Sequence, residues 1–384
     1  MTMTEKPLIV LAAGGTGGHV FPADSLASEL SDRGYRLALI TDRRGDAYGG
    51  SLGEIETHRI RAGGIAGKGP FAKIRSLLEL GVGIFQAHRL LKRLSPAAVV
   101  GFGGYASVPT MVAATIAHFP TVLHEQNAVL GRANKLLAAR VARIATSFLS
   151  TKNIPSASME KVVHTGMPVR PAILAKRDAE YPDLNATSPI NLLVMGGSQG
   201  ARVLSDVLPE ALRQLPDALR ARLQITQQCR QEDEARTRNA YNDMGVQADV
   251  APFFDDIPER LVHAHLMIGR SGASSVAEAI TIGRPSILVP YPHATDDHQS
   301  ENAHALDEVG GGWLIPEEAF TPETLAGRLN ELFSMPATLQ KAASCAKTAG
   351  RADAARQLAD AVLGLLPGNG ANGNGRTELR RQAA

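Results

Sequence analysis

Near the start of the chain, a histidine directly follows a glycine-rich turn. The sequence Gly-Gly-Thr-Gly-Gly-His occupies residues 14–19 and comes after the apolar stretch Leu8–Ala13. This apolar stretch predicts a strand, so His19 would lie at a strand's carboxyl end, where open α/β sheets bind ligands. An imidazole can accept a proton near neutral pH, which makes His19 a candidate general base for an attacking hydroxyl. The alternative is a histidine that only caps or lines the turn.

A similar turn occurs about half a chain later. Gly-Gly-Ser-Gln-Gly at residues 196–200 follows the apolar stretch Ile190–Met195. A turn without bulky side chains lets an anion approach the backbone N–H groups at the N-terminus of the helix that follows. Two such turns predict two similar domains that face one another. Taken alone, the first turn is also compatible with a tight structural turn or a dinucleotide-binding loop.

Polar residues also end a later strand, predicted at Thr121–His124. His-Glu-Gln-Asn at residues 124–127 would emerge at the same sheet edge as His19. Glu125 is therefore a second candidate base, and Asn127 a candidate hydrogen-bonding contact. The alternative is an ordinary hydrophilic loop. Gly-Phe-Gly-Gly-Tyr at residues 101–105 ends the preceding strand and would let a substrate approach the backbone closely.

In the second half, two further segments are suited to binding phosphate and ribose. Ser198 lies in the second glycine turn, where its hydroxyl could contact a diphosphate. The loop at residues 270–278, Arg-Ser-Gly-Ala-Ser-Ser-Val-Ala-Glu, again joins an apolar strand to a helix. Its hydroxyls and amides suit phosphate oxygens, and Glu278 could accept hydrogen bonds from both ribose hydroxyls. A helical glutamate is otherwise most often solvated.

The elements that would position these residues alternate along the chain. Short apolar stretches separated by amphipathic ones are typical of βαβ units on parallel sheets. The predicted strands are Leu8–Ala13, Arg36–Thr41, Ala98–Phe102, Thr121–His124, Ile190–Met195, Arg222–Gln227, Leu266–Ile268 and Ser286–Val289. The predicted helices include Phe21–Arg33, Phe71–Leu94, Ser275–Ile282, Ser300–Val309, Pro322–Phe333 and one or two closing helices within Thr338–Leu366.

A polar segment with two prolines at residues 177–189 predicts a linker between two domains. The N-terminal domain would then comprise residues 1–176, and the C-terminal domain residues 190–366 with the closing helices. Residues 367–384 are rich in glycine and asparagine and predict a disordered tail.

Composition favours a soluble two-domain enzyme and excludes several other classes. The 384 residues exceed what one hydrophobic core usually serves. A net charge of +2, from 40 basic and 38 acidic residues, gives no basic field for nucleic acid. Two isolated cysteines, Cys229 and Cys345, make a zinc site or a disulfide framework improbable. No Asp-x-Asp sequence occurs, so neither a metal ion bridging a diphosphate nor another cofactor is expected.

Taken together, the motifs resemble those of the MurG family of bacterial glycosyltransferases. The matching segments, in chain order, are GGTGGHVFPA, GGYAS, HEQN, GMPVR, GGSQGA, FFDDI and SGASSVAE. They extend from about Leu8 to the helices near Leu366. The resemblance implies an α/β protein of the GT-B fold, with two Rossmann-like domains facing each other across a cleft. It also implies that UDP-N-acetylglucosamine is held mainly by the C-terminal domain.

The resemblance assigns roles to individual residues. Donor-binding roles fall on Thr16, Gly17, Gly18, Asn127, Arg170, Ser198, Phe254, Ser274, Ser275, Glu278 and Gln299. Phe254 would act through its backbone, at a position that is usually aliphatic in the family. The segment 293–299 is one residue longer than in some relatives, so His298 is an alternative to Gln299.

The resemblance also implies the reaction. N-acetylglucosamine would move, with inversion, to the C4 hydroxyl of the muramoyl sugar of undecaprenyl-diphospho-muramoylpentapeptide, converting lipid I to lipid II in peptidoglycan synthesis. His19, or failing that Glu125, would deprotonate that hydroxyl. Alternatives are another glycolipid synthase of the same fold, a non-catalytic sugar-nucleotide binder, and an NAD-dependent oxidoreductase built on the first glycine turn.

A lipid acceptor raises the question of membrane binding. No segment approaches the roughly 18 apolar residues of a spanning helix. Ile74, Leu77, Leu78, Val82 and Phe85 recur at helical spacing, which is typical of a helix packed on a core. The basic residues around them favour the alternative, peripheral binding to anionic lipid at the cytoplasmic face of the inner membrane. They are Lys68, Lys73, Arg75, Arg89, Lys92 and Arg93.

Overall fold

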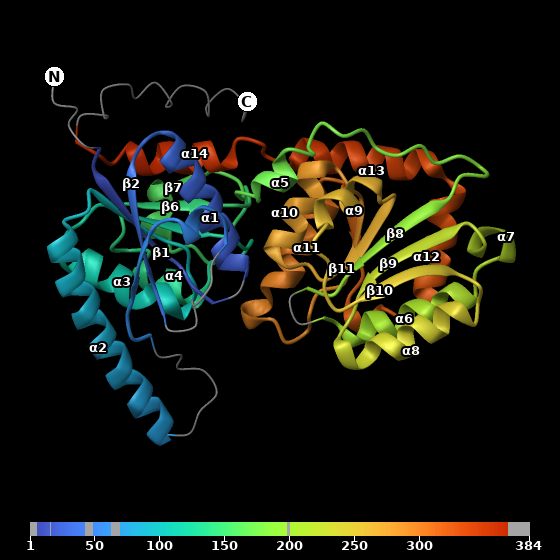
Figure 1. Cartoon of the computed structure of the whole chain (residues 1–384), viewed down its shortest axis with the longest axis horizontal. Helices are drawn as coiled ribbons and strands as arrows, with labels where there is room; N and C mark the ends of the chain where they lie inside the picture. The colour runs from blue at the N-terminus through green and yellow to red at the C-terminus, as the bar shows by residue number, and fades with distance from the viewer. Residues whose placement is uncertain (1–5, 16, 43–48, 63–69, 198–199, 368–384) are drawn as a thin grey trace.

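Two parallel β-sheets organise the chain, one in each half (Figure 1). The computed structural model describes residues 6–15, 17–42, 49–62, 70–197 and 200–367. Within these residues the first sheet has seven strands, in the order β3-β2-β1-β4-β5-β6-β7. Their bounds are β1 Leu8–Ala12, β2 Arg36–Thr41, β3 Glu56–Arg59, β4 Ala98–Gly101, β5 Thr121–Glu125, β6 Arg143–Thr146 and β7 Val162–His164.

The second sheet repeats the same strand order. Its six strands within the described residues run β10-β9-β8-β11-β12-β13. They are β8 Ile190–Met195, β9 Leu223–Gln228, β10 Gln247–Ala251, β11 Leu266–Gly269, β12 Ser286–Leu288 and β13 Gly312–Leu314. In each half the first strand lies beside both its second and its fourth, which is the doubly wound order of Rossmann-like domains. The predicted fold class, two α/β domains of similar construction, is confirmed.

Both faces of the central strand β1 are buried, which explains why this strand is apolar without interruption. Along β1, Ile9 and Leu11 belong to one hydrophobic core, whereas Val10 and Ala12 belong to another on the opposite face. Successive side chains of a strand point to opposite faces, so a strand covered by helices on both sides must be apolar throughout.

The strands that the sequence analysis did not predict lie mainly toward the sheet edges. β3, with the sequence Glu-Thr-His-Arg, ends the first sheet and is mostly exposed. β10 and β13 end the second sheet. An edge strand has one neighbour instead of two and needs no continuous apolar stretch, so its sequence gives little signal.

Helices connect the strands and begin and end at recognisable residues. α2 begins with Pro70 at its first position, and α10 ends before Gly283, whose φ of 79° is left-handed. The helices are α1 Gly17–Asp32, α2 Pro70–Leu94, α3 Gly104–Ile116, α4 Arg132–Leu137, α5 Pro171–Leu174, α6 Arg202–Arg213, α7 Asp217–Arg220, α8 Glu234–Asn242, α9 Ile257–His263, α10 Ala273–Ile282, α11 His298–Glu308, α12 Pro322–Ser334, α13 Pro336–Ala349 and α14 Ala354–Leu363.

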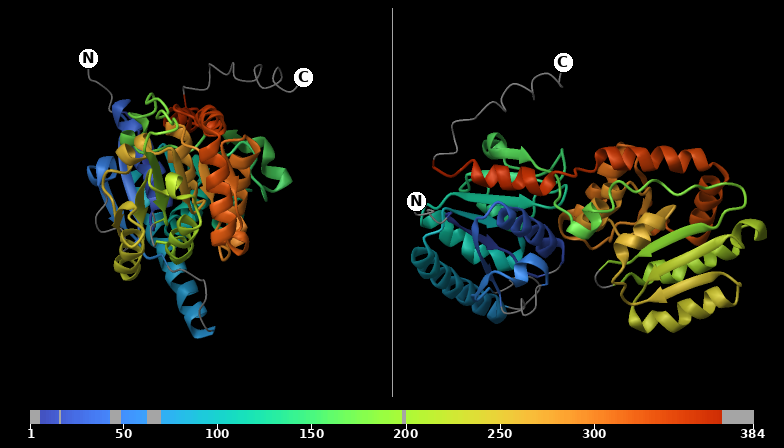
Figure 2. Two further views of the ribbon diagram at one scale, coloured as in Figure 1. Left: turned by 90° about the vertical axis from the view of Figure 1, so that its right-hand side faces the viewer. Right: turned by 45° about the horizontal axis from the view of Figure 1, so that its top comes forward.

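The last helix corrects the predicted domain boundaries. α13 packs on α10 in the second half, but the chain then crosses back and α14 packs on α1 (Figures 1 and 2). Leu358 and Val362 are fully buried in the core that contains Ile9 and Leu11. The assignment of all closing helices to a domain of residues 190–366 was therefore wrong for α14. Its amphipathic pattern requires burial but does not specify against which domain.

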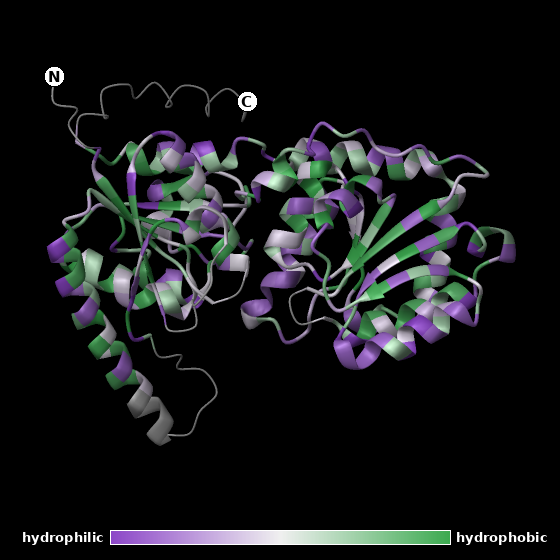
Figure 3. Ribbon diagram, viewed as in Figure 1, coloured by the Kyte–Doolittle hydropathy of each residue, from purple (hydrophilic) through white to green (hydrophobic). Residues whose placement is uncertain are grey.

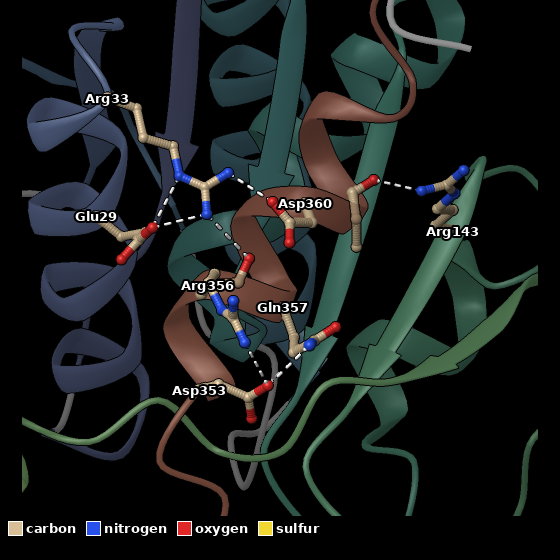
Figure 4. Close-up of polar contacts among 8 residues, drawn as sticks. Glu29, Arg33, Arg143, Asp353, Arg356, Gln357 and Asp360 are labelled. Atoms are coloured by element: carbon tan, nitrogen blue, oxygen red, sulfur yellow. Dashed lines mark hydrogen bonds and ion pairs between the residues drawn. The ribbon is translucent and has the colours of Figure 1, made fainter. Parts of the chain in front are cut away.

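Polar contacts at the edges of this buried apolar face also attach α14 to the first domain (Figure 4). Arg33, directly after α1, donates to Asp360 at 2.5 Å and also pairs with Glu29 at 2.7 Å. Arg143 in β6 donates to the backbone oxygen of Ala361 at 2.7 Å. The chain therefore passes between the two domains twice, once before β8 and once between α13 and α14.

Candidate functional site

His19 lies where three neighbouring strands of the first sheet end. The turn after β1 passes through Gly15, whose φ of +91° suits glycine, and His19 follows in the first turn of α1. Its Nδ1 is 3.1 Å from Oε1 of Gln126, which follows β5. The Gly103–Gly104 turn after β4 abuts the ring, since a Cβ on Gly104 would lie 3.2 Å from its Nε2. The structure thus brings together the three predicted loops, because β1, β4 and β5 are adjacent.

Glu125, the second candidate base, is buried and fully hydrogen-bonded. One carboxylate oxygen accepts from the backbone N–H of Asn127 at 3.0 Å and from its side-chain amide at 3.3 Å. The other accepts from the backbone N–H of Gly131 at 2.9 Å and from Asn134 at 2.8 Å. These four donors come from its own loop and the start of α4, so the carboxylate organises that loop.

Asn302 joins this loop to the second domain, and no motif in the sequence predicted this role. It lies in α11 and is fully buried. Its Oδ1 accepts from the backbone N–H of Ala128 at 2.8 Å. Its Nδ2 donates to Oδ1 of Asn127 at 3.1 Å and to the backbone oxygen of Ser271 at 3.0 Å. The only sequence signal is a polar residue on the face of α11 that buries Ala303 and Leu306.

Two predicted donor-binding residues, Arg170 and Glu278, are bonded to each other across the domain boundary. Arg170 precedes α5, and Glu278 lies in α10. Nε and Nη2 of Arg170 donate to the two carboxylate oxygens of Glu278 at 2.8 and 2.9 Å. Arg170 also lies 4.8 Å from the ring centre of Phe21. Burial raises the pKa of Glu278, and the hydrogen bonds and charge of Arg170 oppose that rise.

The start of α10 contains hydroxyls without partners. Ser274 and Ser275 lie in its first turn, after the N-cap residue Gly272. The hydroxyl oxygens of Ser271 and Ser274 are buried and have no hydrogen-bond partner among the described residues. Buried polar atoms are normally paired, and a helix N-terminus carries unsatisfied N–H groups. This end of α10 is therefore suited to an anionic ligand rich in hydrogen-bond acceptors.

The remaining predicted residues have varied surroundings. Gly17 and Gly18 open α1. The Phe254 ring is buried beneath the guanidinium of Arg260, 4.0 Å from the ring centre. Gln299 accepts from the backbone N–H of Tyr291 at 2.9 Å. Thr16 and Ser198 lie outside the described residues.

The longer segment at residues 293–299 contains an unusual turn. Asp296 and Asp297 are both left-handed, with φ of 54° and 53°. Asp296 forms an ion pair with Arg132 of α4 at 2.8 Å, and the nearby Glu301 pairs with Lys152 at 2.6 Å. Together with Asn302, this end of α11 is therefore attached to the loops of the first domain.

Comparison with known proteins identifies the family. The glycosyltransferase family 28 N-terminal domain matches residues 9–146, and the family's C-terminal domain matches residues 191–358. The chain belongs to glycosyltransferase family 28. This assignment replaces the dinucleotide-binding interpretation of the first glycine turn.

Several family 28 relatives match almost the whole chain. A UDP-N-acetylglucosamine--N-acetylmuramyl-(pentapeptide) pyrophosphoryl-undecaprenol N-acetylglucosamine transferase from Paramagnetospirillum magneticum is 61% identical, covering 95% of this chain and 98% of the relative. A protein of the same name from Rhodospirillum rubrum is 57% identical, covering 94% of this chain and 92% of the relative. The crystal structure of Acinetobacter baumannii MurG superposes with a TM-score of 0.73 at 30% identity, covering 93% of this chain and 99% of that one. The predicted resemblance is confirmed.

The buried imidazole of His124 predicts how the stability of the protein depends on pH. Burial, with a smaller contribution from the nearby His19, lowers the pKa of His124 from 6.5 to about 4, against the opposing effect of a hydrogen bond with the backbone of Gly166. Between those values the unfolded chain binds a proton that the folded protein does not, so the free energy of unfolding decreases as pH falls from about 6.5 to about 4. The full decrease from this group is about 3 kcal/mol. His124→Asn should flatten this dependence, as measured by urea unfolding at several pH values.

The slope, not the absolute stability, is the test for His124. His164 and His265 also have lowered pKa values, but they contribute equally to both proteins. His304→Asn, at an exposed position of α11, is the control and should keep the wild-type slope. Equal slopes for His124→Asn and the wild type would contradict the prediction.

Proposed function

We propose that this chain transfers N-acetylglucosamine from UDP-N-acetylglucosamine to the C4 hydroxyl of the muramoyl sugar of undecaprenyl-diphospho-muramoylpentapeptide, the lipid I to lipid II step of peptidoglycan synthesis. The observation that carries the proposal is the 61% identity, across both domains, to a relative whose name states this transfer. The chain is thus a hexosyltransferase whose partners are a nucleotide sugar and a lipid-linked acceptor.

The start of α10 is the proposed donor subsite. The hydroxyls of Ser271 and Ser274, which have no partner within the described part of the chain, and the N–H groups at the start of the helix can bind diphosphate oxygens. Glu278, one turn further on, would accept hydrogen bonds from the ribose hydroxyls. Arg170, its partner at 2.8 Å, would lie beside the diphosphate and stabilise the charge on the leaving UDP.

His19 is the proposed general base, in preference to Glu125. Each carboxylate oxygen of Glu125 already accepts two hydrogen bonds, from its own loop and the start of α4. Nε2 of His19 has no partner among the described residues. It would take the proton from the C4 hydroxyl as that oxygen bonds to C1 of the sugar and the bond from C1 to UDP breaks. Attack opposite the leaving group inverts the configuration at C1.

The reaction itself is tested with the His19→Ala variant. Wild-type protein mixed with UDP-N-acetylglucosamine and the lipid-linked acceptor should release UDP. His19→Ala should lower kcat by about 10²–10⁴-fold, because a positioned base contributes that much. The dissociation constant for UDP-N-acetylglucosamine, measured by calorimetry, should change little. His304→Ala is the control, and unchanged turnover in His19→Ala would remove the histidine from the chemistry.

The donor subsite is tested with Glu278→Ala. Loss of the ribose hydrogen bonds should raise the dissociation constant for UDP by about tenfold or more, since hydrogen bonds to a charged group contribute about 1.5–3 kcal/mol. This variant also loses an ion pair between the domains. Glu301→Ala, which removes the Lys152 pair at 2.6 Å, is therefore the matched control and should bind UDP normally. Equal UDP affinity in wild type and Glu278→Ala would refute the ribose assignment.

Membrane association is proposed through α2. None of the helices in the described part of the chain combines the length and apolar content needed to cross a membrane. α2 projects beyond the first sheet, with apolar and polar residues mixed along it (Figures 2 and 3). Its apolar stripe is exposed, so the alternative of a core-facing stripe is wrong for the four members described: Leu77 at 63%, Leu78 at 67%, Val82 at 40% and Phe85 at 62%.

The charges near this stripe favour anionic lipid at the cytoplasmic face of the inner membrane. Arg89, Lys92 and Arg93 are exposed toward the end of α2, and Arg89 lies 5.9 Å from the ring centre of Phe85. Lys68 and the side chains of Lys73, Ile74 and Arg75 lie outside the described part of the chain. A basic helix with exposed leucine and phenylalanine can lie in the headgroup region without crossing the bilayer.

Membrane binding is tested with a double variant, Leu78→Ser with Phe85→Ser. Losing two inserted apolar side chains should weaken binding to phosphatidylglycerol vesicles by at least about tenfold, given about 1.5–3 kcal/mol for each buried side chain. Vesicle co-sedimentation measures the change, and added salt should weaken wild-type binding. Leu149→Ser, at a leucine that is 84% exposed elsewhere, is the control. Equal binding by the double variant and the wild type would exclude α2 as the contact.

A further inference from the structure

We propose that Gln126 is a positioning residue that holds the proton of neutral His19 on Nδ1, so that Nε2 presents its lone pair to the acceptor hydroxyl. This inference rests on the proposed role of His19 as the base. Gln126 is 2% exposed and follows Glu125 at the end of β5. No pattern in the sequence predicted a role for Gln126.

The orientation of the Gln126 amide follows from its neighbours. Nε2 lies 2.9 Å from the backbone oxygen of Phe102 and 3.1 Å from that of His124. A carbonyl oxygen only accepts hydrogen bonds, so the amide atom that faces these two must be the NH₂ nitrogen. In the opposite orientation, Oε1 of Gln126 would face the backbone oxygens of Phe102 and His124. All three oxygens are acceptors, so this contact would contain no donor.

The contacts of His124 are consistent with this orientation. Its Nδ1 lies 3.0 Å from Nε2 of Gln126, and its Nε2 lies 3.3 Å from the hydroxyl of Ser147. Burial keeps this imidazole neutral over most of the pH range, with a pKa of about 4. A neutral ring that accepts at Nδ1 carries its proton on Nε2, where the Ser147 oxygen can accept it. The pattern of donors and acceptors is consistent from Ser147 to Gln126.

The same amide then decides the tautomer of His19. With its nitrogen committed to Phe102 and His124, Gln126 presents Oε1 to Nδ1 of His19 at 3.1 Å. An amide oxygen can only accept, so Nδ1 must carry the proton. A neutral imidazole has one N–H, which leaves Nε2 deprotonated beside the Gly103–Gly104 turn. The partner is an uncharged amide, so it selects the tautomer without adding a negative charge beside the ring.

The tautomer can be measured directly in the full-length protein without substrate. Protein labelled with ¹⁵N-histidine should give, for neutral His19, a protonated Nδ1 and an unprotonated Nε2 in long-range ¹H–¹⁵N spectra. The His19→Ala variant assigns the signal. A protonated Nε2 in the wild type would overturn the proposal, even if every Gln126 variant failed to fold.

Gln126→Met then tests the consequence for turnover. It should lower kcat by about 10–100-fold, as removal of an orienting partner commonly does, and leave the KM for UDP-N-acetylglucosamine nearly unchanged. The His19 signal should shift toward the Nε2-protonated form. Gln227→Met is the matched control, because it removes another buried amide, bonded to Ser205 and Tyr241. That variant should lose stability but keep the tautomer and kcat.

The outcomes separate this inference from the proposed function. Wild-type protein that releases no UDP would refute the transfer, whereas the spectra need no substrate and test Gln126 alone. Wild-type kcat and an unchanged tautomer in folded Gln126→Met would overturn the positioning role while leaving the transfer intact.

Discussion

Buried polar atoms at the end of β5 must each find a partner, and this constraint shapes the whole site. A buried donor or acceptor left unpaired costs about 1–3 kcal/mol, more for a charged group. Glu125 meets the requirement with four donors from its own loop and the start of α4, and the Gln126 amide lies against two backbone oxygens and two imidazoles. These hydrogen bonds hold the loop in the arrangement that places Gln126 against His19. The proposed base, His19, is thus oriented by a side chain whose own orientation is set by its burial.

The same constraint joins the two domains. Asn302 is fully buried, and its amide is paired with three groups only when the loop after β5 and the loop before α10 both lie against α11. The Arg170–Glu278 pair also crosses the boundary, with its carboxylate largely buried. Removing one member of such a pair leaves an uncompensated buried charge. The donor subsite proposed at α10 and the contact between the domains therefore share the Arg170–Glu278 pair.

α14 adds an apolar connection of a different kind. Its buried face completes the core beside α1, so the first domain depends on residues that follow the second domain in the chain. Its polar contacts to Arg33 and Arg143 are partly exposed and contribute less than this burial. The second crossing restricts how far the domains can separate, since both connections between them are packed at each end.

Much of the fold follows directly from the amino-acid order. Apolar stretches bounded by glycine turns specify the central strands, because a strand covered on both faces must be apolar and the turn after it must admit positive φ. Those strands also specify that residues 14–19, 101–105 and 124–127 meet, since parallel strands end at one edge. The edge strand β3 was not predicted, because an exposed strand does not need an apolar pattern.

By itself, the sequence determined the two-domain architecture, the location of His19 at a sheet edge and the family to which the motifs belong. The tertiary structure alone decided that Glu125 is enclosed, that Gln126 orients His19, that Asn302 bridges the domains and that α14 returns to the first domain. The physical reason is the range of the interactions. Strand and turn signals are local, whereas a polar side chain's role depends on which distant donor or acceptor it meets when water is excluded.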